Sequence, residues 1–215
     1  MALQPKETLF FFNEPHSNFR GILAVRGLSK NKLIYENLPK LSHDTNIQKF
    51  TIIDASSAYR FDRDKELIGS QFILFFCCTK ENLQHAIDFF KPQTALAFKD
   101  EEACLEYLYA TICQSIYGAI IDFDETEALE ILKAYKKGQN EELHIINCCD
   151  AEQSNDIPPD VNFFFSNIVN SIEIAHKILT ATTIFKTMSR HADKCVTSLI
   201  VTNHSKSYQK VFWGE

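Results

Sequence analysis

Short apolar runs alternate with amphipathic segments through the middle of the chain. Residues 71–78 are an almost continuous apolar run of the length expected for a strand buried on both faces. A helix should follow, because Thr79 can cap it and Pro92 would end it. The apolar positions of this helix recur at helical spacing: Leu83, Ala86, Ile87 and Phe90. The pattern therefore predicts a buried strand followed by an amphipathic helix.

The alternation continues to about residue 187. Further strands are predicted at residues 94–98, 117–122, 144–149 and 161–165. Helices are predicted after Asp100, from Asp124 to Gly138 with Tyr135 on the apolar face, and from Ile168 to Phe185. Strands joined by helices need crossover connections. The predicted fold class is therefore α/β, with a doubly wound (flavodoxin-like), mostly parallel sheet in three layers.

Strand-like segments also occur on both flanks of this region. On the N-terminal side they lie at residues 8–12, 21–25 and 50–53, and residues 22–35 fit either a hairpin or a strand followed by a helix. On the C-terminal side, residues 197–201 and 209–213 predict a β-hairpin.

Three parts of the chain follow from this pattern. Residues 1–70 are a strand-containing extension or half-domain, residues 71–187 are the α/β domain, and residues 188–215 are a hairpin that packs on the N-terminal part. Residues 1–70 either complete the sheet or form a separate dimerisation element.

Composition and charge narrow the function classes. The 215 residues are 45% hydrophobic and 23% charged, which is an ordinary globular mixture. The net charge of −6 opposes binding to phosphate backbones, so nucleic acid is not an expected partner. No apolar run approaches the ~20 residues that a membrane span needs, and the first residues lack the layout of a signal peptide. We therefore expect no membrane span and a cytoplasmic location.

Cysteine and aspartate residues stand at the ends of the predicted strands. Cys77 and Cys78 end the first strand of the α/β region, Asp122 ends the third, and Cys148 and Cys149 end the fourth. In a doubly wound sheet these ends meet at one edge, where thiolates and a carboxylate could bind zinc or two cysteines could form a redox pair. The alternative is core packing, because successive strand residues face opposite sides and cysteine is often buried. Asp122 equally fits a structural hydrogen-bonding role.

A known family shares the pattern of residues 94–137. A strand is followed by Lys99-Asp100-Glu101-Glu102-Ala103, then by Tyr117-Gly-Ala-Ile-Ile-Asp122 and by Glu127-Ala-Leu-Glu-Ile-Leu132. Over residues 71–187 this resembles the receiver domain of two-component response regulators. The resemblance implies a receiver-like sheet in which Asp122 takes the place of the phosphate-accepting aspartate.

The residues that accompany this aspartate in the family are missing. The acidic pair that would hold Mg²⁺ is replaced by Cys77 and Cys78, the hydroxyl residue corresponds to Cys148, and the lysine is replaced by Ser166 or Asn167. The resemblance therefore implies a degenerate receiver, or pseudo-receiver, with no phosphoryl chemistry, no catalytic residue and no cofactor. Cys77 and Cys148, with the aspartate, remain as candidate metal ligands.

Two functions fit these observations. The first is a non-enzymatic regulatory or signalling module that binds another protein or itself. Its contact surface would come from the flanking aromatic clusters, at residues 8–12 and Phe212–Trp213. The second is a small α/β enzyme or metal-binding protein with a site around Asp122 and the Cys-Cys pairs. The sequence contains no HExxH pair, G-x-S-x-G elbow, Walker motif or dinucleotide fingerprint, which favours the first function.

Overall fold

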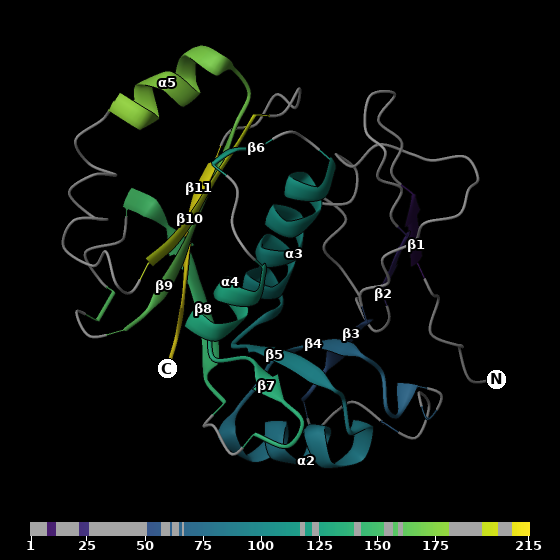
Figure 1. Ribbon diagram of the computed structural model, residues 1–215. Helices are drawn as coiled ribbons and strands as arrows, with labels where there is room; N and C mark the ends of the chain where they lie inside the picture. Colours follow the sequence, from purple (N-terminus) through teal and green to yellow (C-terminus); the bar gives the residue numbers. More distant parts are fainter. Residues whose placement is uncertain are drawn as a thin grey trace.

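The computed structural model describes most of the chain between residues 51 and 215, together with residues 8–11 and 22–25 (Figure 1). Within the longer region it leaves out residues 57–60, 62–64, 66, 117–118, 122–124, 140–142, 153–156, 159–160, 181–194 and 202–207. All structural statements below concern the described residues. The part of the predicted hairpin or strand-helix unit that follows residue 25 and the candidate Asp122 lie outside them.

One large sheet organises this part of the chain. Its strand order is β3-β4-β5-β8-β11-β9-β10-β6, and a short strand, β7, also pairs with β5. The strands are β3 (Thr51–Asp54), β4 (Phe72–Phe76), β5 (Thr94–Phe98), β6 (Ala119–Ile121), β7 (Tyr135–Lys136), β8 (Ile145–Asp150), β9 (Phe163–Val169), β10 (Cys195–Val201) and β11 (Tyr208–Gly214).

Most strands of this sheet share one direction. β3, β4, β5, β8, β9 and β10 are parallel to one another, whereas β6, β7 and β11 run in the opposite direction. The predicted α/β class with a mostly parallel sheet is confirmed. β1 (Thr8–Phe11) and β2 (Ile22–Val25) form a separate antiparallel pair, as strands of the N-terminal flank.

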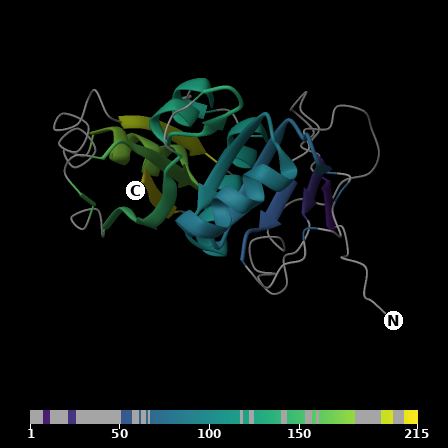
Figure 2. The same ribbon diagram turned by 90° about the horizontal axis from the view of Figure 1, so that it is seen from below.

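Helices cover both faces of the large sheet. α2 (Lys80–Phe90) packs on one face, against β3, β4 and β5. α3 (Glu101–Ile116) and α4 (Glu125–Ile131) pack on the opposite face. α5 (Ile172–Thr180) lies on the same side as α2, against β9 and β10. Figure 2, seen from below, shows α2 against β4 and β5.

This layering explains the continuous apolar run of β4. Ile73 and Phe75 belong to the cluster under α2, while Leu74 and Phe76 belong to the cluster under α3. All four side chains are buried. A strand with a helix layer on each face needs apolar residues at every position, which removes the alternation seen in half-exposed strands.

Capping side chains start two helices where the sequence predicts. The Thr79 hydroxyl accepts the backbone N–H of Asn82 at 3.3 Å, and the Asn82 side chain accepts the N–H of Thr79 at 2.7 Å. Asp100 Oδ1 accepts the N–H of Ala103 at 2.8 Å. The predicted starts of α2 and α3 are confirmed.

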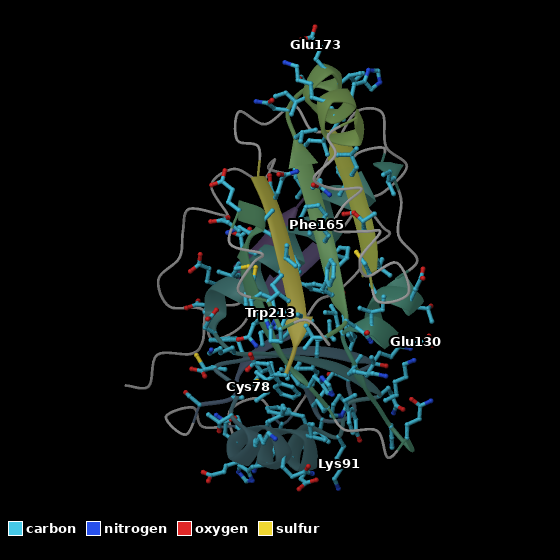
Figure 3. All side chains as sticks on the ribbon, turned by 90° about the vertical axis from the view of Figure 1, so that its left-hand side faces the viewer. Cys78, Lys91, Glu130, Phe165, Glu173 and Trp213 are labelled. Atoms are coloured by element: carbon cyan, nitrogen blue, oxygen red, sulfur yellow. The ribbon has the colours of Figure 1, made fainter. Side chains whose placement is uncertain are left out.

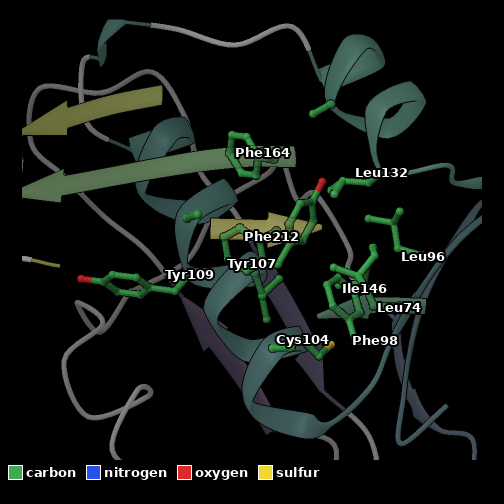
Figure 4. Close-up of a cluster of buried hydrophobic side chains, with 14 of the residues drawn as sticks. Leu74, Leu96, Phe98, Cys104, Tyr107, Tyr109, Leu132, Ile146, Phe164 and Phe212 are labelled. Carbon is green, nitrogen blue, oxygen red and sulfur yellow. The ribbon is translucent and has the colours of Figure 1, made fainter. Parts of the chain in front are cut away.

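An aromatic cluster in the core connects α3 to the strands β5, β9 and β11. The ring of Tyr107 on α3 lies 5.4 Å from that of Phe98 on β5, 6.1 Å from Phe164 on β9 and 5.8 Å from Phe212 on β11. Figure 4 shows these rings together in the cluster. Contacts of this kind contribute about 0.5–1.5 kcal/mol each beyond the burial of apolar area. α3 is therefore packed against strands that are far apart in the chain.

The position of β6 differs from the prediction. A doubly wound, receiver-like order would place this strand parallel to β4 and beside it, but β6 pairs antiparallel with β10 at the far edge of the sheet. α3 explains the difference. Its 16 residues are about 24 Å long, and it contacts strands from β4 to β9. The helix therefore carries the chain across the sheet before β6 begins.

The predicted C-terminal hairpin is wrong. β10 and β11 form near the predicted residues, but β10 pairs parallel with one side of β9 and β11 lies on its other side, between β9 and β8. Val211 is buried on one face of the sheet and Phe212 on the other. Such a strand is stabilised best in the middle of a sheet, and burial there outweighs the short connection that suggested a hairpin. The division of the chain into three parts stays a prediction.

Two predicted helix boundaries also differ. The helix predicted to reach Gly138 ends earlier, because Lys133 has a left-handed φ of 55° and Tyr135 lies in β7. β9 continues beyond its predicted end, so the closing helix α5 begins after Ile168. Every residue of β9 pairs with β10, which keeps this segment extended.

Replacing Lys91 by Gly should stabilise the protein. Lys91 caps the C-terminus of α2 with a left-handed φ of 48°, and its N–H donates to Ile87 O at 2.8 Å. Glycine adopts this conformation without the steric cost of a Cβ. The free energy of unfolding in urea should therefore rise by about 0.5–1 kcal/mol.

The matched control is Glu81→Gly, at an exposed position with right-handed backbone in the same helix. It should lower the free energy of unfolding by about 0.5–1 kcal/mol. A loss of stability in Lys91→Gly would show that the side chain contributes more than its backbone conformation costs.

Candidate functional site

The structure does not bring the candidate cysteines, serine and asparagine together. Cys77 and Cys78 follow β4, whereas Cys148 lies inside β8, and β5 separates these two strands. Ser166 and Asn167 lie inside β9 rather than after it, with buried side chains. In the part of the chain that the structure describes, no three His, Cys, Asp or Glu side chains are placed to hold a metal ion.

Cys77 occupies the turn between β4 and α2. Its φ of 54° is left-handed, which is uncommon for a residue other than glycine and costs on the order of 1 kcal/mol. The side-chain amide of Asn82 holds this turn by donating to Cys77 O at 2.9 Å. The backbone N–H of Glu101, at the start of α3, donates to the Cys77 sulfur. The thiol thus lies at the carboxyl edge of the sheet, beside the N-terminus of α3.

The electrostatic surroundings of Cys77 keep it a thiol. Burial raises its pKa, and the negative charges of Asp54, Glu101 and Asp100 raise it further. The hydrogen bond from the backbone of Glu101 acts in the opposite direction and does not offset them. The thiolate is the form that attacks electrophiles and binds metals. At neutral pH this cysteine is therefore a poor nucleophile and a poor metal ligand.

The other cysteines with resolved shifts are buried or half-buried thiols. Burial raises the pKa of Cys78 to about 12, raises that of Cys148, and holds that of Cys104 on α3 well above its ordinary value. Burial also raises the pKa of Cys195 to about 12. Cys78 and Cys104 belong to the two main apolar clusters of the core. These residues act as small apolar side chains, as the core-packing alternative predicts.

Glu101 presents an oxygen with no described partner near the same edge. Its Oε1 is buried and forms no hydrogen bond within the described residues. Burial and then the charge of Asp54 raise the pKa of this carboxyl. A carboxyl with a raised pKa beside a neutral thiol offers hydrogen bonds to a polar group.

An ion-pair cluster lies between α3, β8 and β11. Lys210 Nζ lies 3.1 Å from Asp150 Oδ1 and 3.6 Å from Glu106 Oε1. The side chains of Lys210 and Glu106 are only 13% and 11% exposed. Burial alone would lower the pKa of Lys210, but the charge of Glu106 and the hydrogen bond to Asp150 outweigh it and raise the pKa. Lys210 therefore remains a cation that connects two strands and a helix.

A polar network lies on the opposite face of β11 and joins this strand to β9 and β10. Gln209 Nε2 donates to Asn167 Oδ1 at 2.7 Å, and Asn167 Nδ2 donates to Ser198 O at 2.9 Å. The Thr197 hydroxyl donates to Phe165 O at 3.2 Å. These bonds run across β11, β9 and β10, so they fix the register of three neighbouring strands. Asn167 is therefore a structural residue of the sheet.

Sequence reasoning missed Lys210 and its partner Glu106. A signal was present, because Lys210 precedes the apolar residues Val211 and Phe212 in a strand, and a charge inside an apolar sheet needs a partner. The identity of that partner depends on where α3 crosses the sheet. No pattern of neighbouring residues in the sequence predicts this crossing point.

No match to this chain was found among protein-family models, curated proteins or solved structures. The resemblance to receiver domains stays a prediction. Among the described helices, none combines the length and the apolar character that a membrane crossing requires.

Replacing Lys210 by Met should destabilise the protein, because Glu106 would remain buried without the charge of Lys210. We expect the free energy of unfolding in urea at neutral pH to fall by about 3 kcal/mol. Asp150→Asn should cost less than about 1 kcal/mol, because Asp150 is 57% exposed. Lys137→Met, at an exposed position, is the control and should change little. Equal effects at the two lysines would contradict a buried ion pair.

The contribution of Lys210 should also depend on pH. Its pKa in the folded protein is raised above the ordinary value of 10.5. The charge therefore stabilises the fold fully below that value, and the contribution is lost as the pH rises through the folded pKa. The difference in unfolding free energy between the wild type and Lys210→Met should stay constant between neutral pH and about 9 and then shrink in alkaline solution. A difference that grows in alkaline solution would contradict a raised pKa of Lys210 in the folded protein.

Proposed function

We propose that this chain is a non-enzymatic, cytoplasmic regulatory module that acts by binding another protein or a second copy of itself. The proposal is supported by the raised pKa of the thiols near the carboxyl edge of the sheet. Ligands and reacting groups of α/β proteins gather at this edge. Here burial and acidic neighbours raise the pKa of Cys77, and burial raises that of Cys78. Such thiols favour a structural role over catalysis.

The described surface favours a polar contact area. Ile68 and Ile172 are the large apolar side chains that are strongly exposed within the described residues, and Ile68 lies in a turn whereas Ile172 lies on α5. Single exposed residues of this kind are ordinary on protein surfaces. The aromatic surface expected at Phe212–Trp213 is wrong, because Phe212 is fully buried and Trp213 is partly buried. The side chains of residues 8–12 lie outside the described part.

A receiver-type signalling role rests on the sequence resemblance alone. The strand before the candidate Asp122 is β6, which does not pair with β4. The regulatory role is proposed because none of the described side chains near Cys77 is an activated nucleophile. The partner in this role is the surface of a protein.

Thiol chemistry at Cys77 is the second candidate function. Two observations favour it: the left-handed backbone of Cys77, and the backbone N–H of Glu101 that donates to its sulfur. Strained residues are enriched at functional sites. In this function a bound ligand would have to offset the negative charges of the acidic neighbours, so that the thiol could become a thiolate.

Alkylation of Cys77 by iodoacetamide should distinguish these two functions. With a raised pKa, Cys77 should react more slowly at pH 7 than an exposed cysteine in a short peptide, and its rate should continue to rise above the ordinary thiol value of 9.0. Peptide mapping by mass spectrometry gives the rate at this residue. Asp54→Asn removes one acidic neighbour and should accelerate the reaction. Rapid alkylation of the wild type at pH 7 would favour the thiol function.

Native mass spectrometry of the reduced protein should detect the partner-binding mode directly. A metal-free dimer or higher oligomer is expected if the chain binds a second copy of itself. A metal-free monomer would indicate that the partner is a different protein. Stoichiometric zinc or an organic ligand that is lost in Asp122→Asn and Cys148→Ala, with the fold retained, would overturn the non-enzymatic proposal. Circular dichroism of both variants serves as the fold control.

A further inference from the structure

Lysine residues gather at the amino edge of the large sheet, where β5 begins. The backbone N–H of Lys137 donates to Gln93 O at 2.9 Å, two residues after Lys91 at the end of α2. Lys136 lies opposite Thr94, the first residue of β5. The loops that follow α2 and α4 therefore meet at this edge. Four described lysines of these loops and of β7 form what we call the basic edge: Lys91, Lys133, Lys136 and Lys137.

Most ammonium groups of the basic edge have no carboxylate partner in the described part of the chain. Lys136 Nζ lies 3.5 Å from Glu130 Oε1, and the Glu130 side chain is 65% exposed. Among the described residues, no carboxylate forms an ion pair with Lys91, Lys133 or Lys137. Lys91 and Lys137 are exposed, and Figure 3 shows Lys91 at the end of α2. The basic edge thus presents positive charge on a protein whose net charge is −6.

Two lysines of the basic edge adopt a backbone conformation that favours glycine. The φ angle is 48° at Lys91 and 55° at Lys133, and Cys77 is the other non-glycine residue with a left-handed φ in the described chain. Lys91 N–H donates to Ile87 O at 2.8 Å. Lys133 N–H donates to Glu130 O at 3.1 Å, so each lysine closes the C-terminus of a helix. A side chain at such a position costs stability, and strained residues are enriched at functional sites.

The helix dipole does not require a lysine at these strained positions. A cation in the last turn of a helix compensates the partial negative charge of the helix C-terminus. Neither α2 nor α4 has a basic residue in its last turn, where the backbone is right-handed and unstrained. Lys91 and Lys133 instead follow their helices, in the loops at the amino edge. Their positions are therefore better explained by a contact made at this edge.

We propose that the basic edge is a docking surface for an acidic, extended segment of a partner protein. Its charges come from both sides of the sheet, because Lys91 follows α2 on one face and Lys133 follows α4 on the other. Charges spread in this way fit a row of carboxylates better than a single phosphate group, which is bound by donors that converge on one point. The net charge of −6 disfavours a nucleic acid. The inference rests on the proposed function, since it names the chemistry of the partner.

Binding of a labelled acidic peptide measures this surface directly. The probe is a fluorescein-labelled peptide of about ten glutamates, which reaches about 33 Å when extended and can cross the whole edge. Its fluorescence anisotropy should rise with wild-type protein in about 50 mM NaCl, and binding should weaken in about 300 mM NaCl because salt screens exposed charges. A wild-type protein that does not bind the peptide at low salt would overturn the proposal.

The double variant Lys91→Gly/Lys133→Gly separates binding from stability. Glycine relieves both left-handed positions, so the free energy of unfolding in urea should rise. The same change removes two charges from the basic edge and should weaken peptide binding about fivefold. A purely structural role of these lysines would not give a gain in stability together with a loss of binding. Wild-type peptide affinity in this variant would overturn the proposal.

Two further double variants control for the charge. Lys91→Arg/Lys133→Arg keeps both positive charges and should bind the peptide like the wild type. Lys80→Gln/Lys99→Gln changes the net charge as much as the glycine double variant does, but at exposed residues near the carboxyl ends of β4 and β5, and should leave binding unchanged. Equal weakening in this variant and in the glycine double variant would show that the peptide senses only the overall charge, which would overturn a defined surface.

Lys137→Glu tests the same surface without changing a left-handed position. Lys137 is an exposed turn residue, so the fold should be retained, which circular dichroism checks. The reversed charge should weaken peptide binding at least as much as the glycine double variant. Unchanged binding in Lys137→Glu would equally overturn the proposal.

Vesicles of phosphatidylcholine and phosphatidylserine test a membrane as the acidic surface. Co-sedimentation of the wild type with these vesicles, without binding of the peptide, would assign the basic edge to a membrane and overturn a protein partner. The broader proposed function fails on different results, namely rapid alkylation of Cys77 or stoichiometric zinc. Those measurements do not involve the four lysines, so the two failures are distinguishable.

Discussion

The insertion of β11 between β8 and β9 is the constraint on which the large sheet depends. Parallel strands are usually joined by helices, and here two parallel groups meet through one antiparallel strand. Tyr107 on α3 spans the same boundary, since its ring contacts Phe98 from one group and Phe164 from the other. The core is thus shared by both groups, although the hydrogen bonding between them passes through a single element. Lys210 adds charged contacts to that strand, because its ammonium group lies near the carboxylates of Asp150 and Glu106.

The polar groups that hold the sheet together are separate from those at its carboxyl edge. Asn167 and Gln209 satisfy each other inside the sheet, which makes β9 a rigid frame rather than a binding edge. The carboxyl edge near Cys77 is different, because Glu101 has an oxygen without a described partner and a raised pKa. The acidic neighbours of the half-buried Cys77 thiol disfavour its thiolate form. The edge is suited to recognition by hydrogen bonds more than to covalent chemistry.

Local features of this fold could be predicted from the sequence, whereas its strand order could not. The apolar run of β4 and the capping residues Thr79 and Asp100 are patterns of neighbouring residues in the sequence. The strand β4 and the starts of α2 and α3 form as these patterns predict. The order depends on the length and direction of α3 and on the site where β11 inserts, and these are decided by packing between distant segments. Packing between distant segments also explains why only part of the candidate site could be predicted. Cys77 and Cys78 could be placed at a strand end, but the burial of Lys210 against Glu106 required the crossing of α3 over β11 to be known.

The order in which the chain is synthesised gives the position of β11 a further meaning. β8 and β9 emerge from the ribosome well before residues 208–215, so each has an unpaired edge while the rest of the chain is made. Unpaired edges of apolar strands attract other strands and promote aggregation. A nascent chain therefore exposes these two strand edges until residues 208–215 have been synthesised, and a product that lacks this segment would expose Phe164 and its neighbours to chaperones and proteases.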